Sequence, residues 1–354
     1  MQRAQTALLG LLTFSLGLAC AGLSPVAAQE PAAAPAAAPG VTAPRAVIPR
    51  KLAPGILTVI PPVLADKETI SGPAAVQDIV DMPGLAVTPN FLPLTQTLHE
   101  MAKEVTLRRE VWGLEFAFKP LRMVRVDIPQ PNGSMQNKLI WYMVYRVTNR
   151  GEHRGPTSEE DRFGQVLYGV GSVNRDIRFF PHLVLEGLVE RTPAEIEAAA
   201  AAGRAELYQR KAYLDRLIPA AIPAIYARER PGAGIRLHNS VEISQVTIKP
   251  SVAGNENAVW GVATWENIDP RIDYLSVFIQ GLTNAFEYET NTAGEVVFKH
   301  KTLQLNFWRP GDWLQEDESE IHYGVPIVDN AKKQAEIYSM YQVTEPLDFR
   351  WIFR

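Results

Sequence analysis

Residues 138–148, KLIWYMVYRVT, form a run dense in aromatic and β-branched side chains. This mixture fits the half-buried surface of a pleated sheet. Residues 114–128, just before the run, alternate in part between apolar and polar side chains, and the intervening residues 129–136 contain the turn signal Asn132-Gly133. The stretch therefore predicts a strand, a turn and a second strand, and a fold that is mainly β.

Two later parts of the chain repeat one pattern. Residues 142–149 are followed by residues 180–188 (FPHLVLEGL), and residues 260–267 are followed by residues 274–282 (YLSVFIQGL). We expect two immunoglobulin-like β-sandwich halves, arranged either as tandem sandwiches or as one larger β assembly. Because the match is short, chance alternation is the alternative. Strands are predicted at residues 177–185, 240–248, 258–266, 274–280, 296–298 and 303–308, and residues 150–174 are expected to form a mobile, charged loop.

A helical insertion is predicted between the two β blocks. Thr192-Pro193-Ala194-Glu195 has the sequence of a capping box with proline at the first helical position. Apolar residues then recur at helical spacing, with Gly203 as a possible break and Pro219 and Pro223 at the end. Two roles for residues 192–230 remain open. They either pack over a sheet edge or form an arm that recruits a partner or a second copy.

The N-terminus resembles an export signal. Arg3 precedes an apolar stretch, and Val26-Ala27-Ala28 is a small-residue cleavage site. Cys20 is the only cysteine, and it also lies in a partial lipoprotein-type motif, so a lipid anchor on Cys20 is the alternative to a free secreted or periplasmic protein.

The predicted organisation follows from these patterns. It comprises a signal peptide at 1–28, an Ala/Pro-rich linker at 29–54, an extended or partly helical segment at 55–111 with a short helix over 95–111, a first β block at 112–191, the helical insertion at 192–231, and a second β block with a C-terminal helix and strand at 232–354.

Charge and motifs narrow the possible functions. The 354 residues carry a formal net charge of −4 with dispersed basic residues, which argues against nucleic-acid binding. The sequence lacks a Gly-x-Ser-x-Gly elbow, a phosphate-binding Gly-Lys-Ser/Thr loop and a His-x-x-x-His pair. We therefore expect no cofactor and no catalysis, although a hydrolase with carboxylates from distant parts of the chain remains a lesser alternative.

Two groups of residues are candidate binding sites. Trp308 and Trp313 flank a predicted turn and are candidates for stacking on sugar rings. The tract DWLQEDESE supplies the carboxylates of Asp312, Glu316 and Asp317, which are candidates for a Ca²⁺ site, with a solvated acidic turn as the alternative.

Residues 260–284 (WGVATWENIDPRIDYLSVFIQGLTN) and the final DFRWIFR resemble segments of uncharacterised secreted proteins of planctomycete-type bacteria. The resemblance implies export and a β fold, and it carries no activity. We expect an exported, non-catalytic protein with a structural or protein-binding role at the cell envelope. A carbohydrate-binding module is the main alternative, and homo-oligomers through residues 192–230 are a further possibility.

Overall fold

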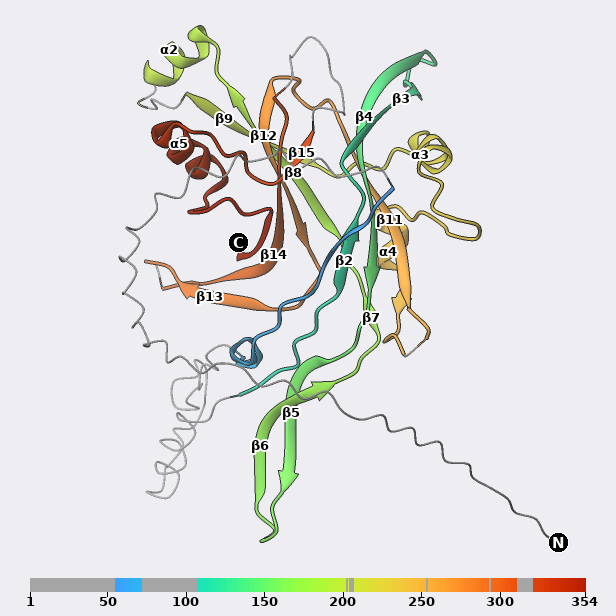
Figure 1. Cartoon of the computed structure of the whole chain (residues 1–354), viewed down its shortest axis with the longest axis vertical. Helices are drawn as coiled ribbons and strands as arrows, with labels where there is room; N and C mark the ends of the chain where they lie inside the picture. Colours follow the sequence, from blue (N-terminus) through green and yellow to red (C-terminus); the bar gives the residue numbers. More distant parts are fainter. Residues whose placement is uncertain are drawn as a thin grey trace, which may run out of the picture. The chain divides into compact units, whose positions relative to one another are not determined.

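The aromatic run around residue 140 lies in β4, the central strand of the first of two large antiparallel sheets (Figure 1). The computed structural model describes residues 55–71, 107–201, 203, 207–252, 254–292, 294–310 and 321–354. All of them belong to one compact unit. The chain is mainly β.

The first sheet has the order β1-β2-β4-β11, and β3 pairs with the other half of the long β4. Its strands are β1 (Thr58–Ile60), β2 (Glu115–Phe118), β3 (Arg122–Pro129), β4 (Met135–Thr148) and β11 (Ala258–Glu266). The expected stretch 114–128 is thus divided into two strands, which are separated by Lys119-Pro120-Leu121 because proline has no N–H for the ladder.

The second sheet has the order β13-β14-β12-β8-β9, with β15 and β16 also paired to the long β14. Its strands are β8 (His182–Glu190), β9 (Tyr208–Leu214), β12 (Ile272–Gln280), β13 (Phe286–Thr290), β14 (Val296–Trp308), β15 (His322–Tyr323) and β16 (Phe349–Phe353). The two strands predicted within 296–308 are one continuous strand.

The remaining elements are short or peripheral. They are the strand pairs β5 (His153–Glu160) with β6 (Val166–Val173) and β7 (Ile177–Arg178) with β10 (Thr247–Ile248), the 3-10 helix η1 (Asp66–Thr69), and the helices α2 (Pro193–Ala201), α3 (Ala221–Glu229), α4 (Ser240–Ser244) and α5 (Ala331–Tyr341). In the predicted helix 95–111, residues 95–106 lie outside the described residues. Arg108 and Val111 instead form isolated β-bridges.

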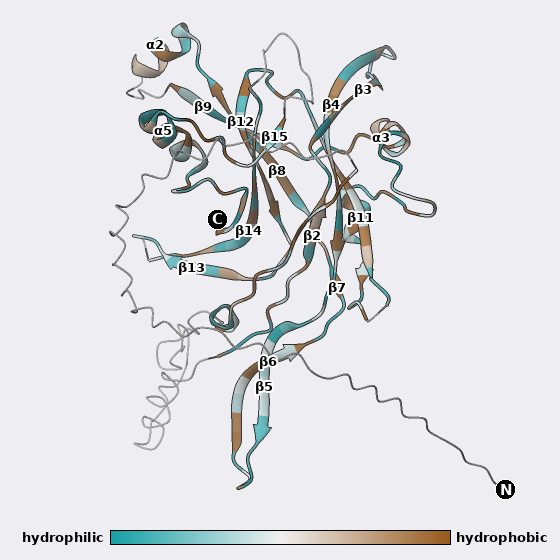
Figure 2. Cartoon of the chain, viewed as in Figure 1, coloured by the Kyte–Doolittle hydropathy of each residue, from teal (hydrophilic) through white to brown (hydrophobic). Residues whose placement is uncertain are grey.

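The main core takes apolar side chains from both sheets. Phe116, Trp141 and Trp265 of the first sheet belong to the same buried cluster as Leu185, Val277 and Leu305 of the second. Hydrophobic residues concentrate on these strands in Figure 2. Trp260 and Trp265 lie on opposite faces of β11, as expected from their spacing, and only Trp265 enters this core. The core therefore joins strands that are far apart in the sequence.

The repeated sequence pattern has a counterpart in strand pairing. β4 pairs with β11, and β8 pairs with β12, so each sheet pairs equivalent strands from the two blocks. In the sequence match Val144 corresponds to Val262 and Val184 to Phe278, and both correspondences are cross-strand pairs in the structure. Each of these two strand pairs is therefore locally symmetric about one cross-strand residue pair.

The helical insertion predicted at 192–231 is helical only at α2 and α3, and a strand, β9, lies between them. The capping box forms, because Glu195 Oε2 accepts from the Thr192 backbone N–H at 2.7 Å, and the helix then ends at Ala201. Gly203 adopts a φ of +74°, and β9 follows, pairing with the edge of β8. The free ladder of β8 outweighs the helical propensity of these residues.

Two other expectations are corrected. Residues 240–248 are not one strand, because the Asn239 side chain accepts from the Val241 and Glu242 N–H groups and starts the short helix α4. Residues 150–174 are not a loop but the hairpin β5–β6, whose turn is held by Asp161 Oδ1.

Candidate functional site

Of the five side chains proposed from the sequence as binding residues, only Trp308 falls within the described part of the chain. It is the last residue of β14 and faces away from the main core. Its ring stacks on His322 of β15, with centroids 4.5 Å apart and planes inclined by 27°. Trp313 and the proposed calcium ligands Asp312, Glu316 and Asp317 lie outside the described residues.

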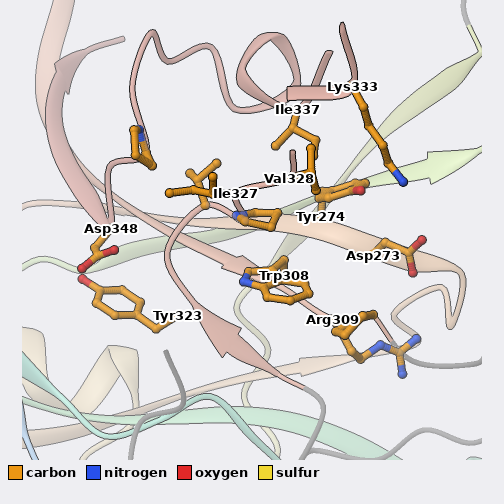
Figure 3. Close-up of a pocket in the computed structure, with 14 residues that line it drawn as sticks. Asp273, Tyr274, Trp308, Arg309, Tyr323, Ile327, Val328, Lys333, Ile337 and Asp348 are labelled. Carbon is orange, nitrogen blue, oxygen red and sulfur yellow. The ribbon is translucent and has the colours of Figure 1, made fainter. Parts of the chain in front are cut away.

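Trp308 lines a cavity of about 460 Å³ on the outer side of the second sheet (Figure 3). The floor comes from the ends of β12 and β14, one wall from α5, and the other wall from the segment that follows β15. Most lining side chains are aromatic, aliphatic or proline, among them Tyr274, Trp308, Val325, Pro326, Ile327, Val328, Ile337 and Pro346. The cavity thus presents an apolar interior.

Helix α5 is oriented toward this cavity by its N-cap. The Asn330 side chain accepts from the N–H groups of Lys332 and Lys333 at 3.0 and 3.1 Å, which fixes the first turn. Lys333 and Ile337 are four residues apart and therefore lie on one face, where both line the cavity. Gln334 holds the facing segment, because its side chain donates to the Pro326 carbonyl and accepts from the Val328 N–H.

A buried polar network anchors the C-terminal end of α5 to the sheet. Asn306 Oδ1 accepts from Ser276 Oγ at 2.9 Å and from Gln304 Nε2 at 2.8 Å, and Asn306 Nδ2 donates to the Leu347 carbonyl at 2.8 Å. Arg350 adds bonds to Gln304 Oε1 and to the Tyr341 carbonyl. Asn306 is fully buried. These bonds hold the end of the helix on the strands, in addition to the apolar cluster of Ile337 and Tyr341.

Charged groups lie at one end of the cavity. Asp273 and Lys333 extend toward each other there, and Arg309 lies beside them (Figure 3). Burial raises the pKa of the Asp273 carboxyl, the nearby Arg309 guanidinium opposes that rise, and Glu190 adds to it. A ligand with an apolar body and a polar end fits this distribution of surface.

Arg309 is the most buried charged group at the cavity, with 1 % of its surface exposed. Its Nη2 donates to the Pro270 carbonyl, and its backbone N–H donates to the Asp273 carbonyl at 2.7 Å. Among the described residues, its Nε and Nη1 have no hydrogen-bond partner. The guanidinium also lies 6.0 Å from the ring of Trp141 in the main core, so it ties the cavity floor to the interior.

At the other end, the Tyr323 hydroxyl and the Asp348 carboxylate point toward each other (Figure 3). Asp348 also restricts which residue can follow Tyr323 in the chain. Gly324 has a φ of +97°, and a Cβ atom built on it would lie 2.5 Å from Asp348 Oδ1. Only glycine fits at this position, so the turn that closes the cavity depends on it.

Most of the cavity could not be found from the sequence, because its residues come from five separate segments. Tyr274 was placed on a strand without a role, and Ile337 was assigned only to a C-terminal helix. One local signal was present: Asn330 followed by Lys333, Ile337 and Tyr341 at a spacing of four is a capped, one-sided helix. The sequence did not show which strands this face would meet.

Other site classes receive no support from the described residues. No group of three or more His, Cys, Asp or Glu side chains within them is arranged to hold a metal ion. No helix among them has the length and apolar character needed to cross a membrane. The chain matches no family model, no curated protein and no solved structure.

Proposed function

We propose that this chain is an exported, non-catalytic binding protein of the cell envelope, and that the cavity beneath α5 receives an apolar side chain of a protein partner. The observation that carries the proposal is the cavity itself, which combines an apolar interior with charged groups at one end. Its volume lies within the range of roughly 300–1,000 Å³ that is typical of ligand sites.

The cavity also has the rigidity that a binding site needs. The N-cap of α5, the Gln334 bonds and the Asn306 network hold its floor and two walls in place. A preformed site loses little conformational entropy on binding. Ile327, with 42 % of its surface exposed, offers an accessible apolar contact on the wall.

The proposed framework is an immunoglobulin-like β-sandwich. Two antiparallel sheets that share one apolar core support it.

Export is supported by the N-terminal signal pattern alone. The test is to express the full chain in a bacterium, fractionate the cells and determine the mature N-terminus by mass spectrometry. We expect an envelope or secreted form that begins at Gln29, whereas a cytosolic form that retains Met1 would contradict export.

Binding is tested with the full chain on an array of immobilised peptides that vary in aromatic and aliphatic side chains. We expect a set of peptides whose binding is weakened at least about tenfold by Ile327→Asp, because the substitution places a charge on the apolar wall. Val241→Asp is the matched control, since Val241 is similarly exposed on α4 and does not line the cavity. An equal loss of peptide binding in both variants would contradict the proposal, and so would peptide binding that is unchanged by Ile327→Asp.

Carbohydrate binding is the second candidate, and the position of Trp308 on the cavity floor favours it. A glycan array separates the two candidates. Glycan binding that disappears in Trp308→Ala, together with no peptide binding by the wild-type chain, would favour the carbohydrate module.

A further inference from the structure

The hairpin β5–β6 exposes apolar residues that the fold does not use. Tyr168 is 85 % exposed and Phe163 is 77 % exposed, and Val166 and Leu167 are also exposed. Every residue from 162 to 169 is solvent-exposed. An isolated two-stranded hairpin is marginally stable in water. A hairpin with this surface is therefore expected to gain stability from a partner.

The outer edge of β5 is closed to further strands. Arg154 exchanges both backbone hydrogen bonds with Val111, at 2.7 and 2.8 Å, so its N–H and C=O point away from β6. The antiparallel alternation then directs the N–H positions of residues 156 and 158 to the same outer edge. Residue 156 is proline and has no N–H to offer, and Glu160 adds a charge further along. Proline and charge are the usual protections of an edge strand.

The outer edge of β6 has no such protection. The same alternation directs the N–H and C=O groups of Val166, Tyr168, Val170 and Ser172 outward, away from β5. The strand VLYGVGSV contains neither charge nor proline, and its outer edge has no strand partner among the described residues. In Figure 2, hydrophobic colour marks much of β6, whereas β5 is largely hydrophilic. One edge of the hairpin is blocked, and the other is open for pairing.

We propose that two copies of this chain pair through β6, antiparallel and related by a two-fold axis, to form the four-stranded sheet β5-β6-β6-β5. The neutral β6 strands do not repel each other. In this arrangement the tip of each hairpin lies beside the base of the other. The tip residues Glu159, Glu160, Asp161 and Arg162 carry a net charge of −2, and the base residues 174–178 (NRDIR) carry +1. Arg175 is already paired with Glu110, so the base is close to neutral and the acidic tip meets no net like charge there.

The blocked edge of β5 also limits the assembly. In the four-stranded sheet both outer strands are β5, where Pro156 prevents addition of another strand. The two-fold contact is therefore closed, and it predicts a dimer rather than a fibre. This dimer surface is independent of the cavity beneath α5, so its test does not depend on the proposed binding function.

The test is the oligomeric state of the full chain, measured by sedimentation velocity and light scattering over a range of concentrations. Val170→Pro removes an outward N–H and leaves the bonds to β5 intact. We expect it to raise the dimer dissociation constant by about 30-fold or more, because the symmetry removes the same inter-strand bond twice. Ser158→Pro is the matched control, since it removes an outward N–H from β5, and we expect it to dimerise like the wild-type chain.

A wild-type chain that is monomeric at all concentrations would overturn the proposal. A dimer that persists in Val170→Pro would also overturn it and would point to another surface, such as residues 192–230. Thermal unfolding of both proline variants shows whether each remains folded. As a second disrupting variant, Tyr168→Lys places two positive charges near the two-fold axis and is expected to weaken the dimer without a backbone change.

Discussion

The first and second sheets each carry a helix on the face that points away from their shared core, but the two helices are held in different ways. α3 covers the first sheet through an apolar cluster that includes Ile225 and Val144, and this interface is filled. α5 covers the second sheet through a smaller apolar cluster that includes Ile337 and Tyr341, and Gln304 and Arg350 donate to the Tyr341 carbonyl at its C-terminal end. The cavity opens beside this cluster. Hydrogen bonds at the C-terminal end of α5 supplement this smaller cluster, and the space beside the helix stays open as a cavity.

The α3 face contains its own charged group, but that group is fully paired. Glu229 is 7 % exposed, and its carboxylate contacts Lys119 Nζ at 3.2 Å, Arg122 Nη1 at 2.8 Å and the Tyr142 hydroxyl at 2.7 Å. The Lys119 ammonium is itself buried and also donates to the Glu229 carbonyl at 2.9 Å. The network therefore satisfies each charge that the interface buries.

Removing this carboxylate is the most severe way to disturb the α3 face. We expect Glu229→Ala to lower the free energy of unfolding by about 4 kcal/mol, because it leaves the buried Lys119 ammonium without its counter-charge. The measurement is urea denaturation. Glu266→Ala is the control, since Glu266 pairs with Lys138 where both side chains are about one-fifth exposed. We expect it to cost less than about 1 kcal/mol, and equal costs would contradict the buried network.

The difference in packing between the two helices is tested by one substitution in each. Ile225 of α3 and Ile337 of α5 are both almost fully buried. Ile337 borders the cavity, and Ile225 does not. We expect Ile225→Ala to cost about 3–4 kcal/mol and Ile337→Ala about 2 kcal/mol, because a side chain beside an existing void loses fewer contacts. Denaturation of both variants gives the difference, and a larger cost for Ile337→Ala would show that α5 is packed as tightly as α3.

Polar anchoring of α5 is tested at Asn306. We expect Asn306→Leu to cost about 2 kcal/mol, because it removes the acceptor of the buried Ser276 hydroxyl and of one Gln304 N–H and takes the Asn306 donor away from the Leu347 carbonyl. Hydrogen exchange measured by mass spectrometry would show faster exchange in α5 and unchanged exchange in α3. Unaltered exchange in α5 would mean that the network does not anchor the helix.

The smallest expected effect is a difference in how Glu229, beneath α3, and Asp273, beside α5, change the free energy of unfolding as the pH falls. Burial alone would raise the pKa of Glu229, but Tyr142, Lys119 and Arg122 outweigh it and lower the pKa below its ordinary value of 4.5. Its contribution to stability is therefore present above pH 4.5 and is lost as the pH falls through the folded pKa. Asp273 has the opposite sign. Because the pKa of Asp273 is raised in the folded protein, its effect on stability is most favourable at a pH below its ordinary pKa of 3.8. Stability then decreases as the pH rises through the folded pKa.

Denaturation of the wild-type chain, Glu229→Gln and Asp273→Asn between pH 3 and 7 separates the two contributions. We expect Glu229→Gln to reduce the acid-induced loss of stability and Asp273→Asn to increase it slightly. A loss on acidification that is the same in all three proteins would show that neither carboxyl is coupled to folding as described.

The sequence predicted the strands better than it predicted the site. The β11 strand begins and ends where its alternation predicts, because both of its faces are buried against apolar partners. β9 was missed because its pairing partner β8 decides its conformation, and that pairing is not local. Trp308 was identified from its place beside a turn, whereas its cavity partners Tyr274 and Ile337 depend on how β12 and α5 meet. Short-range patterns specify elements, and long-range contacts specify the site.

The pairing of equivalent strands has a consequence for biosynthesis. β4 ends at Thr148, but its neighbour β11 is not complete until Glu266, and β16, which pairs with β14, ends one residue before the C-terminus. A nascent chain that has left the ribosome as far as residue 200 therefore holds one member of each central strand pair without the other. Contacts of such long sequence separation form slowly, so the sheets are expected to assemble only after the strands of the second block have been made.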